Sequence, residues 1–252
     1  MTEAQLRGQR LPDAVLRPPS DTNAFESTVE RLAAAIRLGV FTAGEQLPAE
    51  RDLALRLGVS RVNLREAIAA LRDAEMVQTR RGRGGGTVVT YAGLDTNDAA
   101  SERGAEHAAF LKYRGPRLRD GLDFRRVVEP GAAYLAATRD LSADQRAWLV
   151  ASEAEVVDAA LGGPHRIADS RLHLAIATLS GSAMLIEAVT RAQAVLHDLL
   201  AAIPVLPRNI AHSHEQHRAI VAAVLAGDAV AARAAMEEHC DATSALLRGL
   251  LG

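Results

Sequence analysis

The spacing of apolar residues predicts two helices near the start of the chain. In one stretch such residues recur at intervals of three and four, which places them on one helical face. They are Val29, Leu32, Ala33 and Ile36, and we expect this helix over about 25–38. A second helix is expected from Pro48, which suits a first helical turn, to Gly58, which suits the position just after a last turn.

A third helix and a small hairpin follow. Ser60 is a favoured N-cap for a helix over about 61–74. The apolar stripe of this helix consists of Leu64, Ala67, Ile68 and Leu71. After Glu75 the pattern changes to "MVQTRRGRGGGTVVTY", in which two strand-forming runs flank a glycine-rich turn. This pattern is typical of a β-hairpin.

The rest of the chain has a helical pattern almost throughout. From residue 118 to the end, breaks near residues 140, 162, 180, 204–207 and 227 divide it into about six helices. We therefore predict a mainly α protein: a winged helix-turn-helix of three helices plus a small β-hairpin (residues 21–91), followed by an antiparallel all-α bundle (118–252). Residues 1–20 are expected to form a flexible arm, and 92–117 a linker with a helix near 99–112.

Composition narrows the class of protein. Apolar residues make up 48% of the chain and aromatic residues only 3%, which suits closely packed helices. A net charge of −2 excludes a uniformly basic surface but allows a local basic face. The single cysteine, Cys240, excludes an internal disulfide and fits a reducing compartment. Because no apolar run has the length of a membrane span, we expect a cytoplasmic protein that does not enter membranes.

Arginines are concentrated on the third helix and on the hairpin. At 100° per residue, Arg61, Arg65 and Arg72 lie close together beside the apolar stripe. The hairpin adds Arg80, Arg81 and Arg83, and its glycines at 82 and 84–86 permit close approach to a sugar-phosphate backbone. Since guanidinium groups pair bidentately with guanine edges and phosphates, this pattern predicts binding of double-stranded DNA.

Four residues in the second half have the spacing of a metal site. Asp169 and His173 are four residues apart, so their side chains share a helix face. His217 and His239 flank the turn at Gly227 at similar distances, and an antiparallel helix pair would place them at one level. Three imidazoles and one carboxylate suit a divalent ion, with zinc as the first candidate and nickel or manganese as alternatives. An isolated histidine on a helix can equally be a structural residue.

Residues 25–90 resemble the DNA-binding domain of GntR-family transcription regulators. The matching stretches are "LPAERDLA", "LGVSR", "LREAIAALRDAEMV" and "RRGRGGGTVV". The resemblance implies DNA contacts at Arg51, Ser60, Arg61, Asn63, Arg65 and the wing residue Gly82. Val62 occupies a position that is often polar in relatives.

Residues 118–248 resemble the FCD ligand-binding domain that follows in one GntR subfamily. The matching stretches are "FRRVVEPGAAYLAA", "ADSRLHLAIATLSGSAML" and "SHEQHRAIVAAVLAGDAVAARAAMEEHC". The resemblance implies that Asp169, His173, His217 and His239 hold the metal. It also places Arg125 at the effector pocket, where it would pair with a carboxylate. An ion pair between Arg125 and Glu129, four residues later, is the alternative.

Other polar residues have simpler interpretations. Cys240 is expected to be a packing residue, with participation of its thiol left open. His212 and His214 are expected at the surface because their helical phases diverge. The pair His197-Asp198 is similar to ligands of metal-dependent phosphohydrolases, but it lacks a suitably spaced partner.

The leading hypothesis is a ligand-responsive transcription regulator that binds a palindromic operator as a homodimer. A repressor is preferred over an activator. Its effector would be a small organic acid. Two alternatives remain open: a metal sensor whose effector is the ion itself, and a metalloenzyme attached to a DNA-binding module.

Overall fold

The computed structural model describes residues 24–80, 86–92, 115–201, 203 and 205–251. The predicted arm over 1–20, the helix expected near 99–112, and the wing residues Arg81, Gly82 and Arg83 lie outside these ranges. Within them the chain forms nine helices and a two-stranded antiparallel hairpin. The mainly α fold and the winged helix-turn-helix followed by a helical bundle are confirmed.

The winged-helix part comprises α2 (Ala24–Arg37), α3 (Glu50–Leu57), α4 (Arg61–Asp73), β1 (Val77–Arg80) and β2 (Gly86–Val89). Helix α3 begins two residues later than expected, because Ala49 keeps an extended N-cap conformation after Pro48. Gly58 ends α3 in the left-handed conformation, with φ 68°. In the hairpin, Val77 pairs with Val89 and Arg80 with Gly86. The predicted apolar stripes of α2 and α4 meet the hairpin valines in one core.

The bundle comprises α6 (Gly115–Ala137), α7 (Ala143–Asp158), α8 (Gly163–Leu179), α9 (Ala183–Ala201), α10 (Pro207–Ala226) and α11 (Ala229–Leu251). Helix α6 begins three residues before the expected boundary at 118. Local signals set the other ends. Ser142 and Gln145 form a capping box at the start of α7. Gly227, with φ 75°, ends α10, and the Asp228 side chain accepts a hydrogen bond from the Ala231 N–H of α11.

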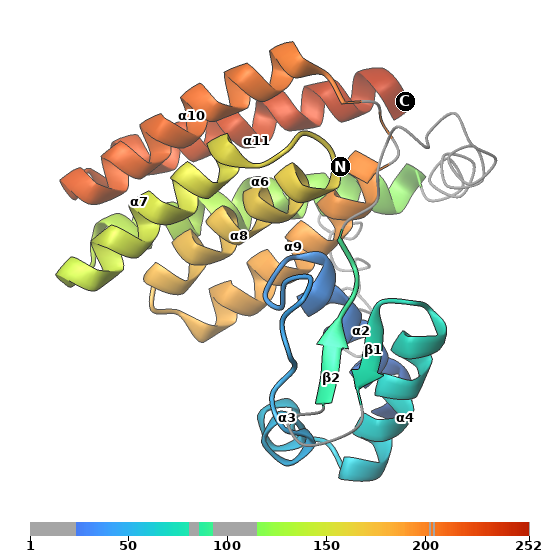
Figure 1. Cartoon of the computed structure of the whole chain (residues 1–252). Helices are drawn as coiled ribbons and strands as arrows, with labels where there is room; N and C mark the ends of the chain where they lie inside the picture. The colour runs from blue at the N-terminus through green and yellow to red at the C-terminus, as the bar shows by residue number, and fades with distance from the viewer. Residues whose placement is uncertain (1–23, 81–85, 93–114, 202, 204, 252) are drawn as a thin grey trace, which may run out of the picture.

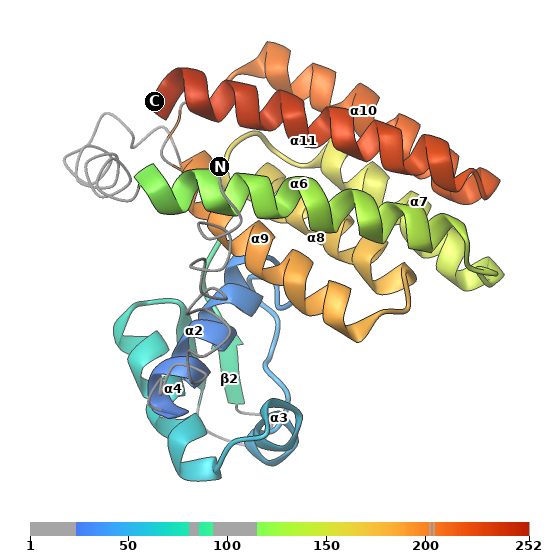
Figure 2. The same ribbon diagram turned by 180° about the vertical axis from the view of Figure 1, so that it is seen from behind.

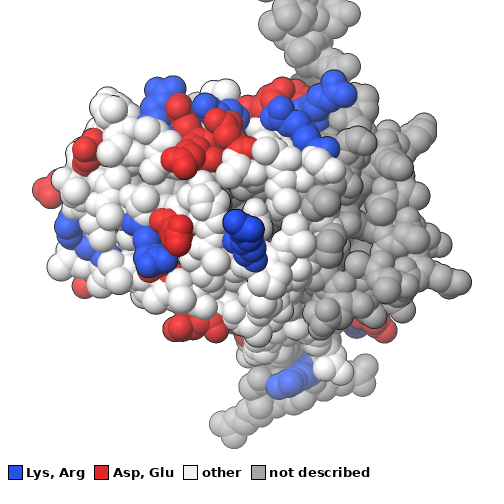
Figure 3. All heavy atoms as spheres, turned by 90° about the horizontal axis from the view of Figure 1, so that it is seen from above, with Lys and Arg blue, Asp and Glu red and all other residues white. Residues whose placement is uncertain are grey.

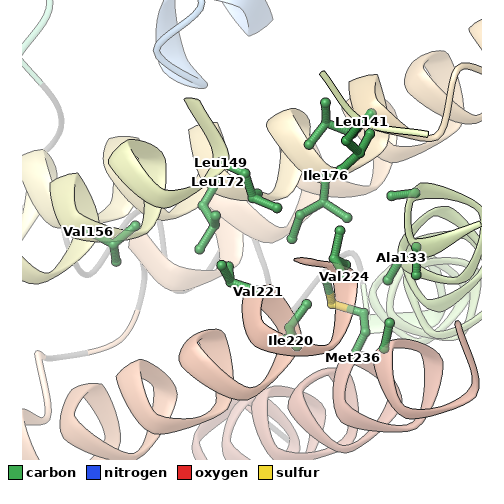
Figure 4. Close-up of a cluster of buried hydrophobic side chains, with 14 of the residues drawn as sticks. Ala133, Leu141, Leu149, Val156, Leu172, Ile176, Ile220, Val221, Val224 and Met236 are labelled. Carbon is green, nitrogen blue, oxygen red and sulfur yellow. The ribbon is translucent and has the colours of Figure 1, made fainter. Parts of the chain in front are cut away.

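Helix α6 packs against α8, α9, α10 and α11 (Figure 1), and its other face lies on the outside of the bundle, nearest the viewer in Figure 2. A large apolar core fills the space between α6, α7, α8, α10 and α11 (Figure 4). Fully buried alanines such as Ala133 and Ala136 let the helices approach closely, while Leu149, Leu172 and Met236 fill the interior. This packing fixes the three helices that carry the predicted metal ligands.

The winged-helix part lies against one side of the bundle, next to α9 (Figure 1). Polar contacts between described residues join the parts. Arg37 of α2 pairs with Asp198 of α9 at 3.1 Å, and the Tyr91 hydroxyl lies 3.2 Å from His197 Nε2. On the face of the bundle shown in Figure 3, described acidic and basic side chains are interspersed and neither sign dominates. Among the described helices, none combines the length and apolar character needed to cross a bilayer.

Candidate functional site

The first candidate site is the exposed N-terminal half of α4. Ser60 caps this helix, because its Oγ accepts a hydrogen bond from the Asn63 N–H at 3.1 Å. Its hydroxyl proton therefore stays available to a phosphate oxygen. Arg61 is exposed, as is Arg51 on α3, and neither forms an ion pair with any described residue. The structure thus gathers the predicted DNA-contacting residues of α3 and α4 on the surface.

Two members of the predicted arginine stripe have intramolecular partners. Arg72 Nε lies 3.8 Å from Asp73 Oδ1. Arg65 Nε lies 2.9 Å from Glu50 Oε2 at the start of α3. The Arg65 side chain remains 63% exposed, so this ion pair is weak and orients the guanidinium group without burying it. Val62, on the same helix, is also 65% exposed. An exposed valine here offers apolar contact to a thymine methyl group instead of a hydrogen bond.

The second candidate site is a buried histidine cluster in the bundle. His173 of α8, His217 of α10 and His239 of α11 have candidate ligand atoms within 4.8 Å of one another. Asp169, one turn before His173, places Oδ1 3.4 Å from His217 Nε2 and Oδ2 3.9 Å from His173 Nε2. The structure therefore brings together all four residues that the sequence indicated.

The chemistry of this cluster fits a divalent cation. His173 Nε2 and both ring nitrogens of His217 are buried and have no hydrogen-bond partner among the described residues. Burial lowers the pKa of His217 to about 3 and holds that of His239 well below its ordinary value. Burial opposes ionisation of Asp169, but His217 and His173 outweigh it and lower the pKa of this carboxyl. Neutral imidazoles beside an ionised carboxylate are the form that binds metal.

Buried polar residues orient the histidines from behind. His239 Nδ1 lies 3.1 Å from Gln216 Oε1, and His173 Nδ1 lies 2.8 Å from Glu129 Oε2. Gln193 donates a hydrogen bond to the other carboxylate oxygen of Glu129 at 2.7 Å. Such partners fix the ring orientation and tautomer of a ligating histidine. The sequence pattern did not indicate this role for Glu129, Gln193 or Gln216. The one available signal was a polar residue at an apolar position of each helical pattern.

Arg125 forms the ion pair that the sequence offered as one alternative, and it also lines a cavity. Its Nε donates to Glu129 Oε1 at 3.1 Å, which confirms the ion pair. Burial opposes ionisation of Glu129, but Arg125 and His173 outweigh it and lower its pKa to about 2. The two terminal nitrogens of Arg125 are buried and have no hydrogen-bond partner among the described residues. Arg125 lines a cavity of about 80 Å³, whose wall also includes Asp169 and His239. A single water needs only about 10–15 Å³, so this space can accept a larger ligand.

The remaining histidines and the cysteine lie outside the four-residue cluster. His212 is exposed, as expected, but His214 is not a free surface residue: its Nε2 lies 2.9 Å from Nε2 of His165, which lines the cavity. His214 is only partly exposed, and this contact with α8 was not expected from the sequence. His197 and Asp198, which the sequence likened to paired metal ligands, contact Tyr91 and Arg37 of the winged-helix part. Cys240 is a buried packing residue, and burial raises the pKa of its thiol to about 12.

Comparison with known proteins agrees with this two-part arrangement. Residues 25–89 match the bacterial regulatory proteins of the gntR family, and residues 120–242 match the FCD domain. The chain belongs to the GntR family of transcription regulators, in the group with an FCD domain. It is thus a DNA-binding regulator with a ligand-responsive domain, in a family of non-enzymatic proteins.

Named relatives cover most of the chain. An Escherichia coli K12 protein named "Putative L-lactate dehydrogenase operon regulatory protein" is 33% identical over 221 residues, covering 85% of this chain and 82% of the relative. The transcriptional repressor NanR of Salmonella newport is 29% identical, covering 93% and 89%. A solved structure of Streptococcus agalactiae GntR aligns with TM-score 0.47 and 26% identity, covering 88% of this chain and 99% of that one.

Proposed function

We propose that this regulator is a repressor that binds a palindromic operator as a homodimer and responds to a small carboxylate bound beside a divalent metal ion. In each protomer, the N-terminal half of α4 would enter a major groove. Arg61 and Arg65 would contact base edges there, with Asn63 beside them. Arg51 and Ser60 would contact phosphates, and so would the wing residues Arg81, Gly82 and Arg83.

In the bundle, the proposed metal ligands are Asp169, His173, His217 and His239. Zinc is the first candidate because three imidazoles and one carboxylate match its preferences. When bound, the ion would supply positive charge and an open coordination position for a ligand oxygen. Glu129 and Gln216 would hold His173 and His239 in the orientation that binding requires.

The observation that carries the effector site is the buried end of Arg125. Its two terminal nitrogens lack partners among the described residues, and the residue lines the cavity beside the histidine cluster. Leaving buried guanidinium donors unpaired is costly, whereas a carboxylate accepts two parallel hydrogen bonds from them. A ligand carboxylate at this position would satisfy Arg125 while its oxygens face the metal ligands.

Helix α9 supports a route from the effector to DNA. Leu196 and Leu200 line the cavity, while the intervening His197 and Asp198 contact Tyr91 and Arg37 of the winged-helix part. A ligand that shifts α9 would change the position of α4 relative to the bundle, and in a dimer the spacing of the two recognition helices. The effector alters operator affinity only as far as its affinity differs between the two geometries.

Metal removal tests this proposal. An operator is first selected from random duplexes by the protein itself, and its affinity is then titrated with and without the carboxylate that calorimetry shows to bind. We expect chelation to abolish the response to the carboxylate, and His173→Ala to have the same effect. Unchanged carboxylate binding by chelated protein would contradict a direct role of the ion. Operator affinity that follows free zinc without any organic ligand would favour the metal-sensor alternative.

A further inference from the structure

The cavity beside the histidine cluster has a second buried cation in its wall. Arg166 of α8 lines this cavity together with Arg125 of α6, and the two residues are 7% and 1% exposed. The charge of Arg166 also acts on its neighbours. Burial is the largest cause of the lowered pKa values of His165 and His197, and Arg166 contributes to both shifts. Two guanidinium groups therefore border one cavity.

The two arginines lie at different levels of the bundle. Arg125 pairs with Glu129, which also contacts His173, so the Arg125 guanidinium group lies beside the cluster. Arg166 precedes His173 by seven residues on the same helix, which corresponds to about 10 Å along the axis at 1.5 Å per residue. At that level its charge lies near His197 of α9. A ligand that pairs with both arginines must therefore carry two anionic groups that are several atoms apart.

Two helix N-termini add positive potential at the Arg166 end of the cavity. The N-cap residues Gly162 of α8 and Leu206 of α10 both line the cavity, and neither supplies a side-chain cap. Each helix therefore presents the positive end of its dipole to this space. Arg166 lies three residues after the start of α8, whose first turn contains no acidic residue. Because a helix N-terminus favours anions over cations, an anionic ligand group here would stabilise both the helix end and the buried arginine.

The wall of the cavity carries more positive than negative charge. Among the described residues that line it, Asp169 is the only carboxylate, against the two cations Arg125 and Arg166. Asp169 is also a proposed metal ligand, so a bound divalent ion would increase the positive excess. Leu196 and Leu200 lie in the same wall and offer apolar contacts to the carbon atoms between two acidic groups. This charge balance favours a ligand with more than one negative charge.

From these observations we infer that the effector carries two anionic groups: a carboxylate at Arg125 and the metal-binding residues, and a second carboxylate or a phosphate at Arg166 and the N-terminus of α8. The inference rests on the proposed function and adds the chemical class of the ligand. Arg166 acts on His197, which contacts Tyr91 of the winged-helix part. The second anionic group therefore binds on the side of the cavity from which α9 contacts the DNA-binding domain.

Diacids and their half esters test the inference. Succinate, glutarate and adipate differ in length, and the monomethyl ester of each keeps the chain but loses one charge. Calorimetry on the full-length zinc-loaded protein should give at least about tenfold tighter binding for the best diacid than for its half ester, because the ester cannot form a charged pair with Arg166. Comparison of 3-phosphonopropanoate with succinate distinguishes a phosphate from a carboxylate as the second group.

The outcomes separate the inference from the proposed function. Half esters that bind as tightly as their diacids at every length would overturn the inference and leave the carboxylate site intact. Binding of none of these acids would contradict the carboxylate site as well. Both outcomes are read on the wild type, so they do not depend on how a variant folds.

Variants of Arg166 test the residue itself. Arg166→Gln should reduce the preference for the diacid over its half ester by about tenfold and leave binding of the half ester nearly unchanged, whereas Arg166→Lys should retain most of the preference. Circular dichroism and urea denaturation check that these variants are folded. Arg171→Gln, at an exposed arginine of the same helix that pairs with Glu155, is the matched control. An unchanged preference in folded Arg166→Gln would refute the assignment of the second anionic group to this arginine.

Discussion

The recognition helix and the histidine cluster carry charge in opposite ways. Arg51 and Arg61 on α3 and α4 stand in solvent, and Arg65 makes only an exposed ion pair with Glu50. In the bundle, by contrast, Arg125 and Glu129 are each 1% exposed and depend on one another. Under the proposed function, we therefore expect substitutions on the exposed helices to change affinity for DNA with little effect on folding. Substitutions around the buried cluster should change folding and ligand binding together.

The largest effect is expected at Glu129. Glu129→Ala removes the carboxylate that pairs with Arg125 and orients His173, and leaves a buried guanidinium group without its partner. We expect the free energy of unfolding to fall by about 3–5 kcal/mol, as measured by urea denaturation. A loss below about 1 kcal/mol would mean that the Arg125–Glu129 pair is not buried as described. Glu187→Ala, which removes an exposed ion-pair partner of Arg191, is the matched control and should change stability little.

The opposite result is expected on the recognition helix. Each of Arg61→Ala and Arg65→Ala should weaken operator binding by about 1–3 kcal/mol and relax sequence preference, because a bidentate base contact is lost. Unfolding stability should stay within about 0.5 kcal/mol of the wild type, since both side chains are exposed. Fluorescence anisotropy with selected and scrambled duplexes measures the first quantity, and urea denaturation the second. A double variant with wild-type operator affinity would refute the assignment of α4 as the recognition helix.

Metal binding should stabilise the bundle and leave the DNA-binding surface unchanged. At a free zinc concentration one hundred times the dissociation constant, the gain in unfolding free energy is about 2.7 kcal/mol. Thermal denaturation with and without chelator measures this gain, and His217→Ala should remove it. An identical midpoint for the wild type in both conditions would contradict the metal site. His212→Ala, at an exposed histidine outside the cluster, is the control.

The buried histidines also predict a pH dependence. The pKa of His217 is lowered from 6.5 to about 3 by burial, so the unfolded chain binds more protons between these two values. The free energy of unfolding of the metal-free protein should therefore fall as pH drops below about 6.5, and the contribution of His217 ends near pH 3. Zinc should move the onset of this loss to lower pH because it competes with protons for the same nitrogens. A metal-free protein whose stability is constant between pH 7 and 4 would argue against burial of these imidazoles.

The smallest effect on stability is expected where the two regions meet. The Arg37–Asp198 pair is partly exposed, with side-chain exposures of 31% and 42%. Arg37→Ala should lower the unfolding free energy by less than about 1 kcal/mol. It should nevertheless change how strongly a bound carboxylate alters operator affinity, because the pair joins α2 to the helix that lines the cavity. A variant with unchanged carboxylate response would place the coupling elsewhere.

The winged-helix part and the histidine cluster differ in how much of their structure the sequence predicts, because one depends on local signals and the other partly on contacts between distant segments. The helices and hairpin of the winged-helix part follow from local signals, such as the Ser60 N-cap of α4 and the Gly58 C-cap of α3. The spacing of apolar residues and these caps were therefore sufficient to predict them. Asp169 and His173 could be paired by helical spacing, and His217 and His239 by their distance from one turn. Contacts between distant segments left no such periodic signal. The His165–His214 pair, the Glu129–His173 contact and the Tyr91–His197 contact all arise from tertiary packing.

The most direct test of the central claim is an operator titration at saturating concentration of a carboxylic acid that calorimetry shows to bind, comparing wild-type protein with Arg125→Met. The claim is that a carboxylate sensed in the bundle controls a recognition helix in the other part of the molecule. Arg125→Met leaves Glu129 without its buried partner, so circular dichroism and urea denaturation must first show that the variant is folded at the assay temperature. Without ligand, the folded variant and the wild type should bind the operator equally. With ligand, the affinity of the wild type should change at least tenfold and that of Arg125→Met should not change. Equal responses in the two proteins, or none in a wild type shown by calorimetry to bind the acid, would contradict the account.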